Sequence, residues 1–182
     1  EDTQTRGQHG DYGRLIDGVR EIATFAEGHD IEIVMENGTA KWSDVPDDVP
    51  AAHVDWSERN VYFGMPPEEW VQVCLDVDRP NVGLCLDSSH VCTYAQTFAE
   101  DSRREEVAMA YLARPDLIRH VHWSDNYLYD PRGRNDSHLS VGKGTLPTEM
   151  HRAIKRLDAT LLLEHFYTAE ELEEELAYID GL

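Results

Sequence analysis

Apolar side chains recur along this 182-residue chain at two different spacings. Residues 11–27 place them three and four positions apart and end at Gly28, which predicts an amphipathic helix. Residues 31–35 are short, β-branched and nearly all apolar, as expected of a strand buried on both faces. Strand, loop and helix then follow one another four times in all. Parallel strands joined by helices indicate an α/β fold.

The same pattern predicts three further strands, at residues 82–86, 117–123 and 160–163. One helix is expected to begin at Pro66-Pro67, three more are expected over residues 89–99, 102–113 and 147–157, and a last one should follow a capping box of Thr168 and Glu171. The residues expected to face the core in the first and the last of these helices are Trp70, Val71, Cys74, Leu75, Leu172, Leu176 and Ile179. Two long polar stretches, 37–65 and 124–146, have the length of functional loops.

Charge changes the picture of the surface. The chain has 36 acidic and 16 basic residues, and its formal net charge is −20. Its hydrophobic content of 41% and its regular apolar spacing argue against a disordered acidic protein. Strong salt screens repulsion among carboxylates, so the composition favours a protein adapted to high salt. The same charge disfavours nucleic acid as a partner, because few cations are present to replace the counterions of phosphates.

Cysteine usage and the chain start bear on the compartment. Cys74, Cys85 and Cys92 are odd in number and follow no C-x-x-C spacing, which indicates buried free thiols in a reducing compartment. We find neither an apolar run long enough for a membrane helix nor the pattern of a secretory signal, and we expect a cytoplasmic protein without membrane contact. Residues 1–182 are interpreted as one domain, with residues 1–10 as a flexible tail or linker. The missing initiator Met suggests further residues upstream.

An ionisable residue stands at the carboxyl end of every predicted strand. These residues are Glu36, Asp87, His122 and Glu164. One acidic residue after a strand is commonly a helix cap or a solvated loop charge. Three carboxylates and an imidazole held together would repel one another unless a cation neutralised them. Such an oxygen-rich set suits one Mn²⁺, Mg²⁺ or Co²⁺, with Zn²⁺ as a further option.

A second set of candidate ligands lies near the first in sequence. His90 follows Asp87 by three residues, and Asp136-x-His138 lies in the long loop after the third strand. Two imidazoles and a carboxylate can bind a second cation or a substrate. In the alternative interpretation, His90 caps a helix while Asp136 and His138 only fix the loop.

Several segments resemble a known family. IEIVMEN, VGLCLDSSH, IRHVHWSDN, NDSHLSVGKGTLP and TLLLEHF are similar to the sugar phosphate isomerase/epimerase group of the xylose isomerase-like TIM barrels, which is related to endonuclease IV. The resemblance runs from about residue 11 to the end and covers only the last four β/α units of an eight-stranded barrel. It therefore implies a half-barrel or truncated barrel. Its two apolar edge strands would pair with a missing N-terminal half or with a second copy of the chain.

The resemblance also implies roles for single residues. The four strand-end residues would bind the cation, and Glu36 and Glu164 would act as acid and base on opposite faces of a substrate carbon. His90, Asp136 and His138 match residues that form a further zinc site in endonuclease IV.

The function implied most directly is isomerisation or epimerisation of a small sugar or sugar phosphate by proton transfer through an enediolate. Further candidates for substrate contact are Lys143, Arg134 and Trp123, although a plain surface role for Lys143 is equally open. One alternative is an endonuclease IV-like phosphodiesterase acting on abasic DNA. Another is an inactive, truncated half-barrel that serves as a binding or assembly module.

Overall fold

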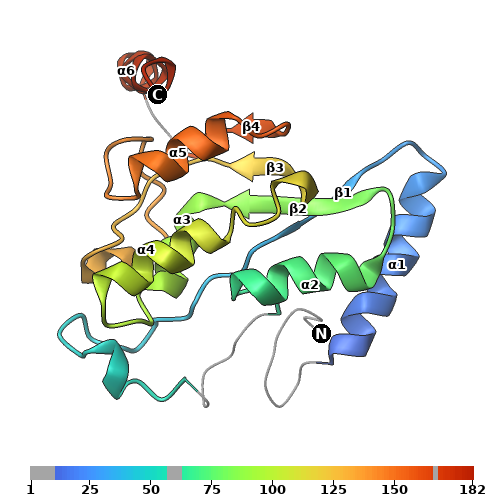
Figure 1. Ribbon diagram of the computed structural model, residues 1–182, viewed down its shortest axis with the longest axis horizontal. Coiled ribbons are helices and arrows are strands. Elements are labelled where there is room, and N and C mark those ends of the chain that lie inside the picture. Colours follow the sequence, from blue (N-terminus) through green and yellow to red (C-terminus); the bar gives the residue numbers. More distant parts are fainter. Residues whose placement is uncertain (1–10, 57–62, 166–167) are drawn as a thin grey trace.

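The described part of the protein forms a four-stranded parallel sheet. The computed structural model describes residues 11–56, 63–165 and 168–182, so the expected tail at residues 1–10 lies outside the described part. The strands are arranged in the order β1–β2–β3–β4 (Figure 1). Their bounds are Ile33–Glu36 for β1, Val82–Asp87 for β2, Ile118–His122 for β3 and Thr160–Leu162 for β4. The predicted parallel α/β fold is confirmed.

Helices connect the strands and flank the sheet. Their bounds are Tyr12–Glu27 for α1, Pro67–Val77 for α2, Ser88–Ala95 for α3, Asp101–Ala110 for α4, Thr148–Lys155 for α5 and Ala169–Asp180 for α6. Short 3₁₀ helices are η1 (Ala51–His53), η3 (Pro115–Leu117) and η4 (Pro131–Arg134). The predicted capping box of Thr168 and Glu171 is confirmed, because each side chain accepts a hydrogen bond from the other residue's backbone N–H. No helix in the described ranges is long and apolar enough to span a membrane.

The core lies where the sheet meets α2, α3 and α4. All six residues of β2 are buried, since this strand is paired on both sides and covered by helices. Trp70 of α2 and the adjoining Tyr111 are fully buried against it. Trp70 donates its indole N–H to the carbonyl of Met35 at 2.9 Å, which fixes α2 to β1. The three predicted cysteine thiols are free and buried, as expected.

The outer strands β1 and β4 were predicted as edges, and within the described residues they pair on one side only. Burial on both faces was expected for strand 31–35, but the strand begins at Ile33, and Ile31 is 52% exposed. In β4, Leu161 and Leu162 are 40% and 46% exposed. The apolar runs were read correctly as strands. Their burial was overestimated because only one side of each strand is covered here.

Two helix faces differ from the prediction. Leu75 of α2 is 42% exposed, because Trp70, Val73, Cys74 and Val77 form the buried stripe and Leu75 lies outside it. Leu176 of α6 is 46% exposed, while the neighbouring Glu175 is the buried residue of this helix. In Figure 1, α6 (red) lies beyond β4, away from the helices that cover the central strands. The side of α6 that is buried is therefore set by the contacts of the Glu175 carboxylate and not by the apolar residues of the helix.

Candidate metal centre

Four ionisable side chains meet at the carboxyl end of the sheet. Glu36, Asp87 and His122 are the last residues of β1, β2 and β3, and Glu164 follows β4 by two residues. One ligand atom of each lies within 4.8 Å of the others. The Nδ1 atom of His122 is central. It lies 2.6 Å from Glu36 Oε1, 2.9 Å from Glu164 Oε2 and 3.6 Å from Asp87 Oδ2.

The donor atoms of this cluster fit one divalent cation. Ligands at about 2.0–2.2 Å from a common ion are separated from one another by about 2.8–3.6 Å in octahedral or tetrahedral geometry. The distances from His122 Nδ1, 2.6–3.6 Å, cover nearly the same range. Asp87 Oδ2, His122 Nδ1 and Glu164 Oε2 are buried atoms without a hydrogen-bond partner. Buried polar atoms are costly to leave unsatisfied, and a cation among them would satisfy all three.

The two carboxylate oxygens of Asp87 have different roles: one caps a helix and the other faces the centre. Oδ1 caps α3 by accepting from the backbone N–H groups of Ser89 at 2.8 Å and His90 at 3.1 Å. Oδ2 faces His122. The helix-cap and ligand interpretations of this residue are therefore compatible, because one oxygen serves each. Asn37, which the sequence analysis did not single out, fixes the backbone of Asp87: its amide accepts from Asp87 N at 2.7 Å and donates to Asp87 O at 3.0 Å.

Negative charge dominates the centre. The polar contact with Asp87, then the charges of Glu36 and Glu164, outweigh burial and raise the pKa of His122 to about 9. Cys85 lies beside the centre on β2. Burial, reinforced by the charges of Glu36 and Asp87, raises the pKa of its thiol to about 12. A dication would compensate the negative field that contributes to both shifts.

The second set of predicted residues also comes together. One ligand atom each of Asp87, His90, Asp136 and His138 lies within 4.8 Å of the others. The Nδ1–H of His90 donates to Asn37 O at 2.8 Å, and that of His138 donates to Glu164 O at 2.7 Å. Each ring therefore presents Nε2 to Asp136 Oδ2, at 3.2 Å and 2.9 Å. A backbone carbonyl that holds one ring nitrogen while the other faces a carboxylate is the arrangement typical of metal-binding histidines.

Charge and backbone strain mark this second set as well. Burial opposes protonation of His90, but its hydrogen bond with Asp136 and the charge of Asp87 raise its pKa to about 9. Burial also acts on Asp136, but its hydrogen bonds to His90 and Ser89 keep its pKa far below the usual range. His138 has a φ of +42°, in the left-handed region that a non-glycine residue seldom adopts. Such strain occurs most often at functional sites.

The order of these residues along four successive β/α units is matched by one family profile. The profile of the xylose isomerase-like TIM barrels aligns with residues 2–182. The chain belongs to the xylose isomerase-like TIM barrel family. The predicted fold class is thereby confirmed, and the four described strands form part of a barrel.

Solved structures of this fold agree with that assignment. A D-tagatose 3-epimerase-like protein has a TM-score of 0.59 and 22% identity, over 93% of this chain and 56% of its own. A xylose isomerase domain protein from Planctomyces limnophilus has a TM-score of 0.56 and 17% identity, over 93% and 51%. A D-psicose 3-epimerase determined in the presence of D-fructose has a TM-score of 0.54 and 18% identity, over 100% of this chain and 58% of its own. The chain thus spans between half and three-fifths of these barrels. No curated protein matches it.

The remaining candidates for substrate contact belong to none of the groups of potential metal ligands in the described residues. Trp123 is 2% exposed and donates its indole N–H to His151 Nδ1 at 3.1 Å. Lys143 is well exposed and lies 3.3 Å from Glu174 of α6. Arg134 is 8% exposed, stacks on the ring of Trp42 and donates to backbone carbonyls. The carbonyls that it reaches are those of Pro46, Asp47 and Val49.

A buried polar network supports the loop that carries Asp136 and His138. Asp125, 1% exposed, accepts from the backbone N–H groups of Gly142 and Leu146 and contacts His151 Nε2 at 3.2 Å. Its backbone pairs with Leu139 across an antiparallel bridge. The sequence analysis placed this aspartate inside a family motif without giving it a role. The structure assigns it to holding residues 139–146 in place.

Proposed function

We propose that this protein is a divalent-metal-dependent isomerase or epimerase of a small sugar or sugar phosphate. One observation carries the proposal. Glu36 and Glu164 extend from the two outermost strands, and each carboxylate lies within 3 Å of the same imidazole nitrogen, at 2.6 Å and 2.9 Å. Two carboxylates on opposite sides of one centre can exchange a proton with the two faces of a substrate carbon.

The glutamates have the accessibility that this chemistry needs. Their side chains are each 41% exposed, whereas that of Asp87 is 1% exposed and that of His122 is 21% exposed. Asp87 and His122 are therefore suited to holding a cation, and Glu36 and Glu164 to reaching a substrate. In this proposal one glutamate removes the proton next to the substrate carbonyl and the other returns a proton from the opposite side.

Glu36, Asp87, His122 and Glu164 would hold the principal cation. When bound, a divalent cation would polarise adjacent substrate oxygens and stabilise negative charge on an enediolate. In the isomerase, His90, Asp136 and His138 would orient substrate hydroxyl groups, whereas in the phosphodiesterase alternative they would hold a second cation. Cation stoichiometry separates the alternatives: about one per chain supports the isomerase, two or three support an endonuclease IV-like phosphodiesterase, and none supports an inactive module. The net charge of −20 weighs against a DNA substrate.

The proposal includes a partner for the two outer strands. Leu161 and Leu162 of β4 are apolar and exposed, and within the described residues β1 and β4 each pair on one side only. Such edges pair readily with other strands. We expect either an upstream half-barrel or a second copy of the chain to complete the substrate cavity. Sedimentation of the 182-residue chain at micromolar concentration tests the second option. A folded monomer with substrate turnover would contradict the need for a partner.

A proton-exchange assay tests the proposed function. The protein is incubated with ketohexoses, or with their phosphates, in D₂O containing Mn²⁺ or Co²⁺, and deuterium at the carbon next to the carbonyl is measured by NMR. Exchange is expected in the wild type and a loss of at least about 100-fold in Glu36→Gln and Glu164→Gln. Glu173→Gln, an exposed change on α6, is the matched control. Metal binding without exchange on any sugar tested would contradict the isomerase assignment.

A further inference from the structure

A third group of potential ligands lies next to the carboxylate centre, closer to the amino ends of β2 and β3. Cys85 of β2 and His120 of β3 are partners in the sheet register, two residues before the pair Asp87 and His122. One ligand atom each of Cys85, His120 and His122 lies within 4.8 Å of the others. We propose that these three residues form a site for a thiophilic divalent cation such as Zn²⁺ or Cd²⁺. The proposal stands independently of the sugar chemistry above.

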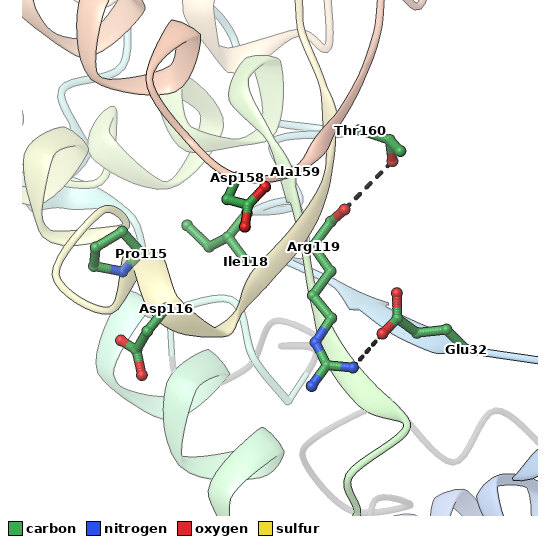
Figure 2. A pocket seen from close by; sticks show the side chains of 8 residues that line it. All are labelled: Glu32, Pro115, Asp116, Ile118, Arg119, Asp158, Ala159 and Thr160. Atoms are coloured by element: carbon green, nitrogen blue, oxygen red, sulfur yellow. Dashed lines mark hydrogen bonds and ion pairs between the residues drawn. The ribbon is translucent and has the colours of Figure 1, made fainter.

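The hydrogen bonds of His120 prepare it as a ligand. The hydroxyl of Thr160 donates to the backbone carbonyl of Arg119 at 3.3 Å, as Figure 2 shows. With the hydroxyl hydrogen engaged in this way, the hydroxyl oxygen accepts from His120 Nδ1 at 2.5 Å in the tautomer that carries its hydrogen on Nδ1, and this is the tautomer that the proposal uses. Nε2 of His120 is left with a lone pair. Metal-binding histidines are commonly held in this way, with the second ring nitrogen donating to a neighbouring oxygen.

The next layer toward the amino ends of the strands contains an ion pair, and Asp116 also lines it. The hollow at the amino end of the strands is lined by Glu32, Arg119, Asp158 and Thr160, and there the guanidinium of Arg119 is paired with Glu32 (Figure 2). The interior face of the sheet thus changes from an Arg–Glu pair through Cys85 and His120 to the carboxylates. Only the middle layer offers sulfur together with imidazole.

Ligand softness separates this site from the carboxylate centre. Mn²⁺ and Mg²⁺ prefer oxygen ligands, whereas thiolate and imidazole select Zn²⁺ and its heavier congener Cd²⁺. A soft cation that binds Cys85 displaces the thiol proton to solvent and forms a cation–sulfur bond, without any oxidation or reduction. His122 belongs to both ligand sets. Its ring meets that of His120 edge to face, with 5.1 Å between the ring centroids. The two sites are therefore adjacent but chemically distinct.

Cd²⁺ titration followed in the ultraviolet tests the proposal, because cadmium bound to a thiolate gives a charge-transfer band that oxygen and nitrogen ligands do not give. The wild-type chain is expected to develop the band and to saturate at one Cd²⁺ per chain. Cys85→Ser should abolish it. Cys74→Ser and Cys92→Ser should retain it, because neither cysteine belongs to a group of metal ligands in the described part of the chain. His120→Gln should weaken Cd²⁺ binding by about 10–100-fold.

Two outcomes would overturn the site: no band in the wild type, or a band of full intensity in Cys85→Ser. His120→Gln keeps the test valid if Cys85→Ser fails to fold, since its side chain is only partly buried. Mn²⁺ binding measured on the same proteins keeps the two proposals separable. Mn²⁺ binding that survives in Cys85→Ser while the cadmium band is lost supports both sites. A cadmium band without Mn²⁺ binding in the wild type supports the soft site and contradicts the carboxylate centre.

Discussion

The Nδ1 atom of His122 lies 2.6 Å from Oε1 of Glu36, although β3 and β1 are separated by the whole of β2. Neighbouring strands are about 4.8 Å apart, so two residues on next-nearest strands approach this closely only where long side chains converge over a curved sheet. In spite of this short distance, His122 Nδ1 has no hydrogen-bond partner of suitable geometry. A ligand atom that faces three carboxylates in this way is the strongest single indication of a cation site in the described structure.

Cation binding should release a proton. The pKa of His122 is raised to about 9 without a cation, so the ring is protonated at neutral pH, while a metal ligand must be neutral. We expect about one proton released per Mn²⁺ at pH 7.5 and an affinity that rises about tenfold per pH unit until about pH 9. Calorimetry in two buffers of different ionisation enthalpy measures the release. The pKa values of His90 and His138 are also raised, and the double variant His90→Gln/His138→Gln removes both of these histidines. No proton release in that variant would contradict a neutral His122 ligand.

Glu175 of α6 should be the residue of that helix on which stability depends most. Its carboxylate is 1% exposed, accepts from Val141 N at 2.7 Å and contacts His165 Nε2 at 2.8 Å. Glu175→Ala leaves a buried donor unsatisfied and should lower the free energy of unfolding by about 1–3 kcal/mol. Glu173→Ala, an exposed neighbour, should stay within about 0.5 kcal/mol. Urea denaturation compares the two. Equal effects would show that α6 is not fixed through Glu175.

Arg134 should stabilise the loop after β1 without affecting metal binding. Its guanidinium stacks 4.2 Å above Trp42 and donates to three backbone carbonyls of residues 46–49. Arg134→Met should cost about 1.5–3 kcal/mol and speed proteolysis within residues 37–56, while the Mn²⁺ affinity is unchanged. Arg132→Met removes an exposed arginine of the same 3₁₀ helix and should cost less than about 1 kcal/mol. A large loss of Mn²⁺ affinity in Arg134→Met alone would assign the residue to the site.

The positions of the site residues could be predicted because two simple patterns coincide. Buried parallel strands are short apolar runs, and each run here stops at an ionisable residue. The strand order then brings Glu36, Asp87 and His122 to one edge. Sequence periodicity could not predict how Asp87 divides its oxygens or that Asn37 fixes its backbone, because both depend on loop geometry. Substrate contact by Trp123 and Arg134 stays a prediction, and in the structure their side chains contact His151 and backbone carbonyls.

Burial was predicted less well than element type. Leu161 and Leu176 are apolar and follow strand and helix spacing, yet both are at least 40% exposed. Apolar spacing identifies the face of a helix or strand that must be buried. It does not indicate whether the residues that bury this face belong to the same stretch of chain. The reverse error concerns Glu175, a charged residue that is buried because His165 and Val141 N satisfy its oxygens.

Adaptation to high salt remains a prediction from the composition. With a net charge of −20, repulsion among surface carboxylates should weaken the fold in dilute buffer. Screening shortens the Debye length from about 8 Å at 0.15 M to about 3 Å at 1 M salt. The melting temperature should therefore rise steadily between low and multimolar KCl. A flat or falling melting temperature would contradict the halophilic interpretation.

The account depends most on one cation at the ends of the four strands. Anomalous diffraction from Mn²⁺-soaked crystals locates that ion directly. The expected result is one strong peak about 2.0–2.3 Å from Glu36, Asp87, His122 and Glu164, lost in a matched Asp87→Asn crystal. Manganese found only on other, exposed carboxylates, with no ion bound to these four side chains at saturating Mn²⁺, would contradict the metal centre.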